Sequence, residues 1–194
     1  IIPGFVEVAS WFELFFVNTL GFSFNTGLFI YILLTLAALA WGLHETYNEK
    51  NYVRMAISFI VAFTLVGIPF FGSHIVLGLI IVAGMTYFFF AKREKINARW
   101  LNTALAMITV ILIGYSTYTV IVIRSAANPP MDQNSPDNVF ALKYYLNREQ
   151  YGDRPLLYGS VYNAPVKLRV EGNMCVPEEI KGEAQYAPKP KTSD

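Results

Sequence analysis

Residues 101–123 read LNTALAMITVILIGYSTYTVIVI, and this stretch contains no charged residue. An apolar run of this length fits the roughly 17–25 residues that an α-helix needs to span a bilayer. Arg124 follows at once, where the end of the span meets a headgroup layer and a long basic side chain can extend toward water. The run therefore predicts a transmembrane helix.

Three further runs of this kind precede it in the chain. They cover Thr26–Leu43, Tyr52–Phe71 and His74–Ala91, at the short end of the spanning range. All are almost uncharged and are separated by short polar connections, a pattern that disfavours four buried helices of a soluble protein. The sequence thus predicts a membrane all-α bundle with about four transmembrane helices over residues 26–123.

The overall composition excludes several other classes of protein. Hydrophobic residues make up 54% of the 194 residues and aromatic residues 15%, with 13 Gly and the single cysteine Cys175. These values argue against disordered, collagen-like and disulfide-rich chains. A net charge of +1 implies no nucleic-acid partner. The chain begins Ile1-Ile2-Pro3, without an initiator Met, and we interpret it as a piece of a longer protein.

Charges in the connections predict the orientation of the bundle. Residues 92–99 hold four basic residues against one acidic residue, residues 44–54 hold two against two, and residues 71–73 hold none. Basic connections stay in the cytoplasm. Both basic connections are therefore expected inside, and residues 1–25 and 124–194 outside.

The segment 1–25 is apolar but interrupted by polar residues. Glu7, Glu13 and Asn18 lie among phenylalanines and Trp11. Two alternatives fit: a helix lying in the membrane interface, or a helix packed in the bundle with its polar residues turned inward.

At residue 124 the composition changes to a neutral segment with nine basic and nine acidic residues. Ser135 is expected to cap a helix that has Pro136 in its first position and runs to about Arg148. Short strands are expected at Leu156–Tyr158 and Val166–Val170, and Ala187–Asp194 as a frayed tail or a cut inside a domain. Residues 124–194 therefore read as a small α+β extracytoplasmic segment, the start of a soluble domain.

Candidate sites are few. Asp132, Asn134 and Asp137 have oxygen ligands at short spacing, but turn and cap chemistry explains them better than a metal site. His44 and His74 are isolated, Cys175 has no His pattern beside it, and Arg148, Glu149, Asp153 and Arg154 suit surface ion pairs. No metal or cofactor is predicted. Arg124 is either an anchor or a contact for a lipid phosphate. These patterns indicate no reaction.

Residues 123–140 read IRSAANPPMDQNSPDNVF and residues 145–159 read YLNREQYGDRPLLYG. Together with IPGF at residues 2–5 and WFELFFVN at residues 11–18, they resemble a family of large bacterial envelope proteins of unknown function. That family is similar to the animal transmembrane protein O-mannosyltransferase. The resemblance covers most of the chain.

The resemblance implies a polytopic glycosyltransferase in the bacterial inner membrane, with residues 1–25 and 124–194 on the periplasmic side. Such an enzyme transfers a sugar, for example mannose, from a polyprenyl-phosphate donor to a protein hydroxyl or a glycan. The family's catalytic acid lies in an earlier outer loop, so no catalytic residue carries over here. Glu7 and Glu13 are the only acids in the first outer segment. The fragment alone is expected to be inactive and to need the missing parts of the same polypeptide.

Two other functions remain open at this stage. One is a non-catalytic membrane scaffold or subunit of an envelope complex, which the lack of a matched acid favours. The other is a small transporter, which the lack of broken spans and intramembrane charges disfavours.

Overall fold

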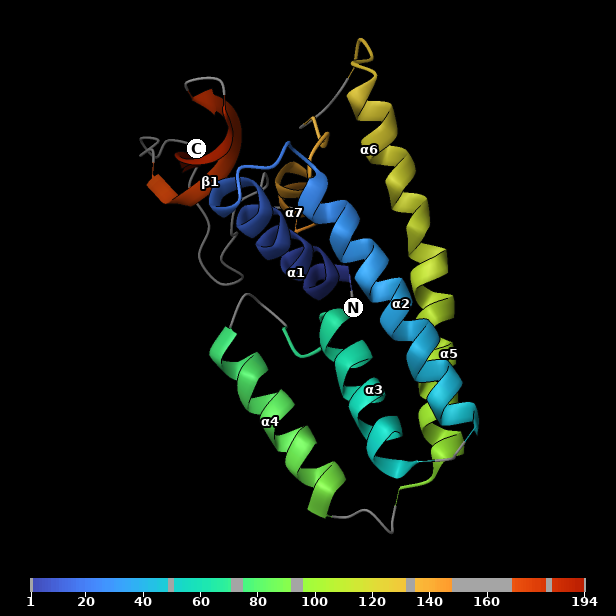
Figure 1. Ribbon diagram of the computed structural model, residues 1–194. Helices are drawn as coiled ribbons and strands as arrows, with labels where there is room; N and C mark the ends of the chain where they lie inside the picture. The colour runs from blue at the N-terminus through green and yellow to red at the C-terminus, as the bar shows by residue number, and fades with distance from the viewer. Residues whose placement is uncertain are drawn as a thin grey trace, which may run out of the picture.

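The computed structural model describes residues 2–48, 51–70, 75–91, 96–131, 135–147, 169–180 and 183–193. The chain is mostly helical and closes with one antiparallel hairpin (Figure 1). The hairpin, the short helix α7 and the start of α2 lie at one end of the bundle, which we call the hairpin end. The end of α2, the start of α3, the end of α4 and the start of α5 lie at the opposite end.

The elements follow one another in a simple order. They are α1 (Ile2–Leu14), the π-helical turn η1 (Phe15–Thr19), α2 (Thr26–Asn48), α3 (Tyr52–Leu65), α4 (Ile75–Ala91), α5 (Ala98–Tyr115), the 3-10 turn η3 (Ser116–Tyr118), α6 (Thr119–Ala126), α7 (Val139–Leu146), β1 (Arg169–Ile180) and β2 (Glu183–Ser193).

Two helices are long and apolar enough to cross a membrane: α2, with 23 residues, and the continuous helix Ala98–Ala126, with 29 residues. The expected spans Tyr52–Phe71 and His74–Ala91 contain shorter apolar helices, α3 with 14 residues and α4 with 17. Four membrane-length helices were expected, and the described residues supply two. The turn after α3 accounts for part of the difference, because Pro69 cannot continue a helix.

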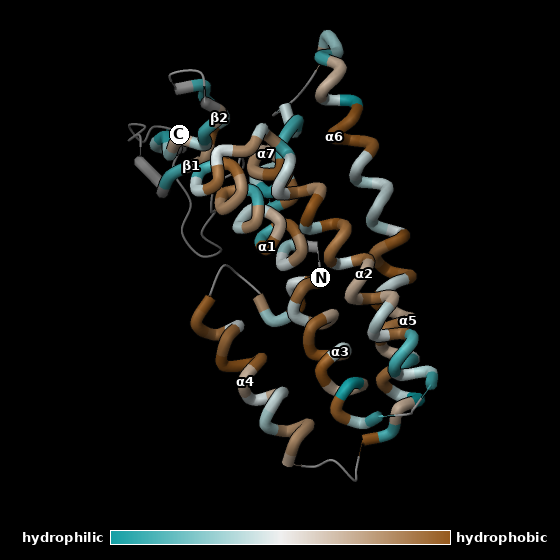
Figure 2. Tube along the Cα trace, in the orientation of Figure 1, coloured by the Kyte–Doolittle hydropathy of each residue, from teal (hydrophilic) through white to brown (hydrophobic). Residues whose placement is uncertain are grey.

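Hydropathy differs between the middle of the molecule and its two ends. Figure 2 shows α4 and α5 as mostly apolar along their length, whereas hydrophilic residues gather in the hairpin and near the α2–α3 connection. In the most apolar window of Ala98–Ala126, only 6% of the residues are buried. An apolar helix so widely exposed is unfavourable in water and matches a lipid-facing surface.

Hydroxyl and amide side chains tie the helices together. The Tyr31 hydroxyl donates to the carbonyl of Leu65 at 2.6 Å, which joins α2 to the end of α3. The Tyr52 hydroxyl donates to the carbonyl of Phe89 at 2.7 Å, which joins α3 to α4. Asn102 donates to the Thr46 hydroxyl at 2.9 Å, which joins α5 to the end of α2.

Two glycines allow α1 to contact the turn after α3. A Cβ at Gly4 would lie 2.0 Å from the carbonyl oxygen of Gly67, and a Cβ at Gly67 would lie 2.3 Å from that of Gly4. Gly67 also has φ +79°, a conformation that other residues adopt at a cost. The backbones can approach this closely only because both positions lack a side chain.

The helix α1 is packed against the bundle, which selects the second of the two alternatives for residues 1–25. Its residues Glu7 and Glu13 are buried, and α1 contacts both α2 and α7. The polar residues therefore turn inward, as that alternative requires.

The hairpin corrects one expectation for the outer segment and extends a second. Residues 187–193 belong to β2 and pair with β1, for example Ala187 with Val176, so they are not a frayed tail. Of the strand expected at Val166–Val170, the last two residues belong to β1, which continues to Ile180, and residues 166–168 lie outside the described residues. The expected strand at Leu156–Tyr158 lies outside the described residues.

The start of α7 is a second correction. The helix begins at Val139, and Asn138 caps it by accepting bonds from the N–H groups of Phe140 and Ala141. Ser135, the expected cap, has φ +38° and lies outside the helix. Asn138 satisfies two otherwise unpaired helix donors, and this explains the later start. The helix ends at Leu146, close to the expected Arg148.

Candidate functional site

A buried carboxylate lies at the hairpin end. Glu13 of α1 is fully buried and accepts hydrogen bonds from the backbone N–H groups of Asn25, at 2.5 Å, and Leu28, at 2.9 Å. These groups lie at the start of α2, where unpaired donors and the helix dipole favour a negative charge. Gly27 makes the approach possible, since a Cβ there would lie 2.6 Å from the Glu13 Cα.

Tyr186 of β2 completes this contact from the other end of the chain. Its hydroxyl donates to the Glu13 carboxylate at 3.2 Å. Its backbone N–H donates to the Asn18 side-chain oxygen at 2.9 Å, and its carbonyl accepts from the Asn18 amide at 3.0 Å. Asn18 thus pairs with Tyr186 as a neighbouring strand would. The Tyr186 ring also packs against Phe24 and Phe140.

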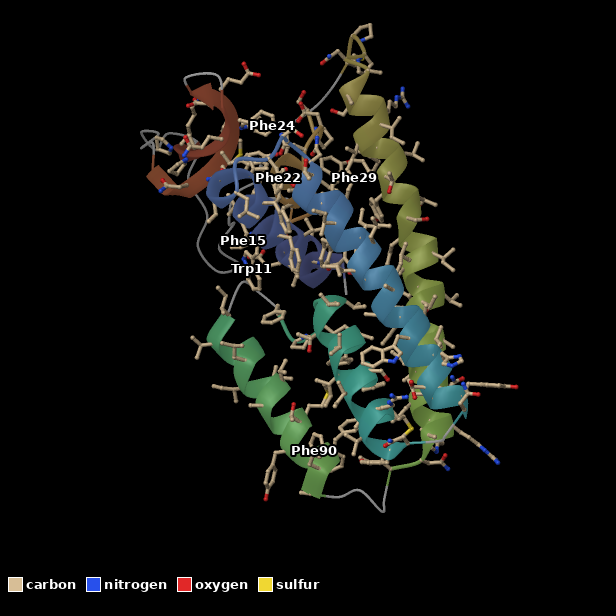
Figure 3. The ribbon with its side chains drawn as sticks, viewed as in Figure 1. Trp11, Phe15, Phe22, Phe24, Phe29 and Phe90 are labelled. Atoms are coloured by element: carbon tan, nitrogen blue, oxygen red, sulfur yellow. The ribbon has the colours of Figure 1, made fainter. Side chains whose placement is uncertain are left out.

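A salt bridge also fixes α7 to α1. The Lys143 ammonium lies 2.5 Å from the Glu7 carboxylate, which is buried. Together the Glu13, Tyr186 and Glu7–Lys143 contacts hold the outer layer, defined as α7 and the hairpin, against α1 and α2. Figure 3 shows that Phe22, Phe24 and Phe29 lie close to this junction, whereas Phe90 lies at the far end of α4.

Two side chains of the hairpin have shifted acidities. Burial raises the pKa of the Tyr186 phenol above its ordinary value, and the negative charge of Glu13 raises it further. Burial also raises the pKa of the Cys175 thiol, an effect that nearby Lys143 opposes. Both groups therefore stay protonated at neutral pH, and a protonated thiol is a poor nucleophile.

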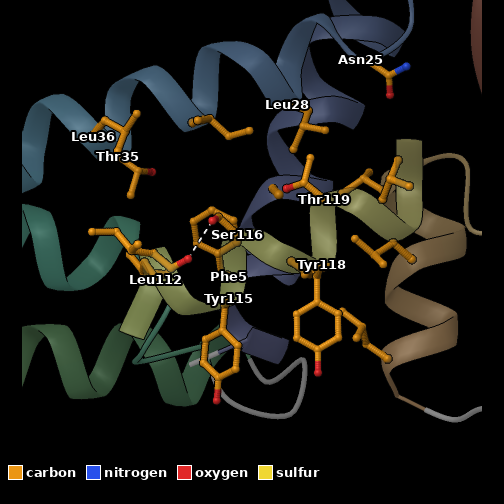
Figure 4. A pocket seen from close by; sticks show the side chains of 18 of the residues that line it. Phe5, Asn25, Leu28, Thr35, Leu36, Leu112, Tyr115, Ser116, Tyr118 and Thr119 are labelled. Atoms are coloured by element: carbon orange, nitrogen blue, oxygen red, sulfur yellow. Dashed lines mark hydrogen bonds between the residues drawn. The ribbon is translucent and has the colours of Figure 1, made fainter. Parts of the chain in front are cut away.

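An apolar groove of about 400 Å³ runs beside the outer layer, between α1, α2 and α7 on one side and the α5–α6 helix on the other. Leu36 and Leu112 line the groove away from Asn25 (Figure 4), and the buried Leu39 also lines it. Asn25, Asp137 and Asn138 line its end next to the starts of α2 and α7. Asp137 is the only charged residue among the described residues that line it.

The turn η3 shapes one wall of the groove. Tyr115, Ser116, Tyr118 and Thr119 line it where the long helix tightens into a 3-10 turn. The Ser116 hydroxyl bonds back to the carbonyl of Ile113 at 2.7 Å, so it is occupied within its own helix. Sequence analysis did not single out this GYSTYT stretch, although a polar patch inside an apolar run is a visible signal.

Two described residues that were singled out from the sequence, Arg124 and His44, lie on different helices. Arg124 is exposed in the last turn of α6 and is not a groove residue. His44 is exposed on α2, where its ring hydrogen-bonds to Asn48. The remaining positions, His74, Asp132, Asn134, Arg148, Glu149, Asp153 and Arg154, lie outside the described residues.

Three residues that the structure brings together carried little signal in the sequence. Asn18, Asn25 and Tyr186 are separated by up to 168 residues, and the pattern around each reads as an ordinary turn or strand. Within the described ranges, no group of three or more His, Cys, Asp or Glu side chains is arranged to hold a metal ion.

Comparisons of the chain with protein-family models, with curated proteins and with solved structures find no match.

Proposed function

We propose that this chain is part of a polytopic membrane glycosyltransferase that transfers a sugar, such as mannose, from a polyprenyl-phosphate donor to protein hydroxyls or glycans. The observation that supports the proposal is the outer layer fixed to the membrane-length helices through Glu13, Asn18 and Tyr186. A lipid-linked donor reacts at the membrane surface, so the groups that position it must be rigid relative to the spans.

The proposed setting is the bacterial inner membrane, with the hairpin end on the periplasmic side. Three widely exposed aromatic residues lie near the opposite end: Tyr47 (80% exposed), Tyr87 (77%) and Trp100 (77%). Tyr and Trp favour the membrane interface, where the ring is apolar and the polar atom meets water. The helix ends that flank the two basic connections lie at that same end, which supports a cytoplasmic placement for it.

Sugar transfer requires a base for the acceptor proton and a positive charge for the leaving phosphate. We assign the base to neither Glu7 nor Glu13, because Glu7 is paired with Lys143 and Glu13 already accepts from three donors. The base is proposed to come from the missing parts of the same polypeptide. Arg124 stays the candidate for the phosphate contact.

The Arg124 assignment can be tested by Arg124→Lys in the full-length protein. If Arg124 binds the phosphate through two parallel bonds, Lys is a poor substitute and the transfer rate falls roughly thirty- to a thousand-fold. Near-normal transfer at unchanged abundance would assign Arg124 to anchoring alone.

A non-catalytic scaffold of an envelope complex is the second candidate, and the engagement of both N-terminal acids in structural contacts favours it. The deciding experiment purifies the product of the full open reading frame and supplies it with polyprenyl-phosphate mannose and a hydroxyl acceptor. Our proposal predicts transfer by the full protein and none by the 194-residue chain. A folded full-length protein that transfers no sugar from any polyprenyl-phosphate donor would support the scaffold.

A further inference from the structure

We expect the groove beside the outer layer to extend from one headgroup layer of the membrane into the hydrocarbon core. Along the continuous helix Ala98–Ala126, Trp100 and Tyr118 are 18 residues apart, a rise of about 27 Å, close to the roughly 30 Å of a hydrocarbon core. An interface at Tyr118 places the apolar part of the groove within the bilayer. The end formed by Asn25, Asp137 and Asn138 then lies at headgroup level.

The length of the groove suits one lipid chain. It extends along α2 from Asn25 to Leu39, 14 residues or about 21 Å, somewhat more than one leaflet of hydrocarbon. Its walls are mostly aliphatic, and its deep polar members are hydroxyls already bonded within their helices, such as Thr35 to Tyr31 and Thr109 to Leu105. The body of the groove can therefore hold a ligand through apolar contacts, and these hydroxyl groups are already hydrogen-bonded within their helices.

The charge at the polar end selects the headgroup. Asp137 is exposed and accepts a hydrogen bond from the Asn138 side-chain amide at 2.8 Å, and no cation of the described residues pairs with it. Two acids of α1 near this end are engaged, Glu7 by Lys143 and Glu13 by the start of α2. A negative charge beside an apolar groove attracts an ammonium group and repels a headgroup that carries only negative charge.

We propose that the groove binds one acyl chain of a phospholipid with an ammonium headgroup, of the phosphatidylethanolamine class, and that Asp137 contacts the ammonium group. Asn25 and Asn138 flank this position with amide groups that can donate to the lipid phosphate. The bound lipid fills the gap between the outer layer and the α5–α6 helix. This site is separate from the sugar-transfer chemistry proposed above.

The headgroup part is tested by native mass spectrometry of the protein purified in detergent. Phosphatidylethanolamine and phosphatidylglycerol with the same acyl chains are added in equal amounts. We expect retention of phosphatidylethanolamine to exceed that of phosphatidylglycerol roughly two- to fivefold, as for a partly exposed ion pair. Asp137→Asn, which keeps the oxygen that accepts from Asn138, should remove the preference. Glu45→Gln, at the far end of α2, should keep it.

The location is tested by two neighbouring substitutions. Thr119 lines the groove, whereas Val120 is exposed and does not. Thr119→Trp should fill the groove and reduce retention of phosphatidylethanolamine, and Val120→Trp should leave it unchanged. Thermal unfolding of both variants establishes that they are folded.

Three outcomes would overturn the proposal. Equal retention by the two tryptophan variants would exclude the groove, and an unchanged preference in Asp137→Asn would exclude the headgroup contact. If undecaprenyl phosphate displaces phosphatidylethanolamine from the wild-type protein, the groove binds the anionic donor lipid instead. Displacement by undecaprenyl phosphate would contradict the phosphatidylethanolamine site and would support the proposed transferase. A failure of sugar transfer would not affect the proposal that the groove binds phosphatidylethanolamine.

Discussion

At the scale of single residues, Glu13 joins three parts of the chain through one carboxylate. Its oxygens accept hydrogen bonds from the backbone N–H groups of Asn25 and Leu28 at the start of α2 and from the hydroxyl of Tyr186 in the hairpin. Glu13→Gln replaces one acceptor oxygen by an NH2 group, so a buried backbone N–H loses its partner. We expect a loss of about 1–3 kcal/mol in the free energy of unfolding.

Glu45→Gln is the matched control for this substitution. Glu45 accepts from the Trp41 indole at 3.3 Å on an exposed part of α2, and its replacement should change stability by less than about 0.5 kcal/mol. Unfolding of both variants in the same detergent, by heat or by added denaturing detergent, gives the comparison. Equal stabilities would mean that Glu13 does not support the outer layer.

The buried phenol of Tyr186 predicts that the stability of the folded protein depends on pH in the alkaline range. Burial and Glu13 raise the phenol pKa in the folded protein above its unfolded value, so folding favours the protonated phenol. This contribution is fully present below the unfolded pKa of about 10 and is lost as the pH rises through the folded pKa. Above pH ~10, wild-type stability should therefore fall more steeply with pH than that of Tyr186→Phe.

The same substitution provides a spectroscopic measurement. Subtracting the phenolate absorbance of Tyr186→Phe from that of the wild type isolates one tyrosine of the 12. Its titration should begin above the ordinary tyrosine range and coincide with loss of the hairpin contact. Titration of this one phenol at pH ~10 would argue against its burial.

At the scale of elements, the crossing of α1 with the turn after α3 depends on two glycines. Gly67→Ala would place a Cβ against the Gly4 carbonyl and would strain a backbone with positive φ. The backbones must separate, so we expect a destabilisation of at least ~2 kcal/mol. Gly84→Ala is the control, because nothing lies within 4 Å of the added Cβ in α4. It should leave stability unchanged or increase it by up to about 1 kcal/mol.

The two variants are compared by thermal unfolding in the same detergent. A Gly67→Ala protein as stable as Gly84→Ala would mean that the two backbones do not touch at this crossing.

Helices were more predictable from this sequence than the contacts between distant segments. The apolar runs starting at Thr26 and Leu101 predict the two longest helices, since continuous hydrophobicity is a local property. Strand pairing between residues 169–180 and 183–193 was missed, because it depends on partners rather than on local pattern. The start of α7 was placed at Ser135 because Pro136 suits a first helical position, whereas Asn138 makes the actual cap.

The candidate site was less predictable than the helices for the same reason. Glu7 and Glu13 stood out only as acids in an apolar segment, and their buried state fits the packed alternative for residues 1–25. Their partners Lys143 and Tyr186 lie more than a hundred residues away in the chain. No local periodicity encodes such a pairing. The groove likewise exists only once α2, α5 and α7 are placed together.

At the scale of the whole molecule, the arrangement of helices makes a prediction about the membrane. The end of α2, the start of α3, the end of α4 and the start of α5 share one end of the molecule, and the outer layer occupies the other. Tyr47, Tyr87 and Trp100 mark one interface and Tyr118 the other, so both basic connections fall beyond the same interface. Single cysteines introduced on a Cys175→Ser background report the two sides. In intact spheroplasts, an impermeant maleimide should label Met131→Cys, since Met131 is 94% exposed beyond α6.

Lys95→Cys, in the α4–α5 connection, should react only after the membrane is permeabilised. The alternative orientation would place six basic residues of residues 50–99 on the outer face, against the bias that retains basic connections in the cytoplasm. Labelling of Lys95→Cys in sealed spheroplasts would reverse the orientation. It would also move the groove and its Asp137 end to the cytoplasmic leaflet, where an outer-face sugar transfer has no access to the outer layer.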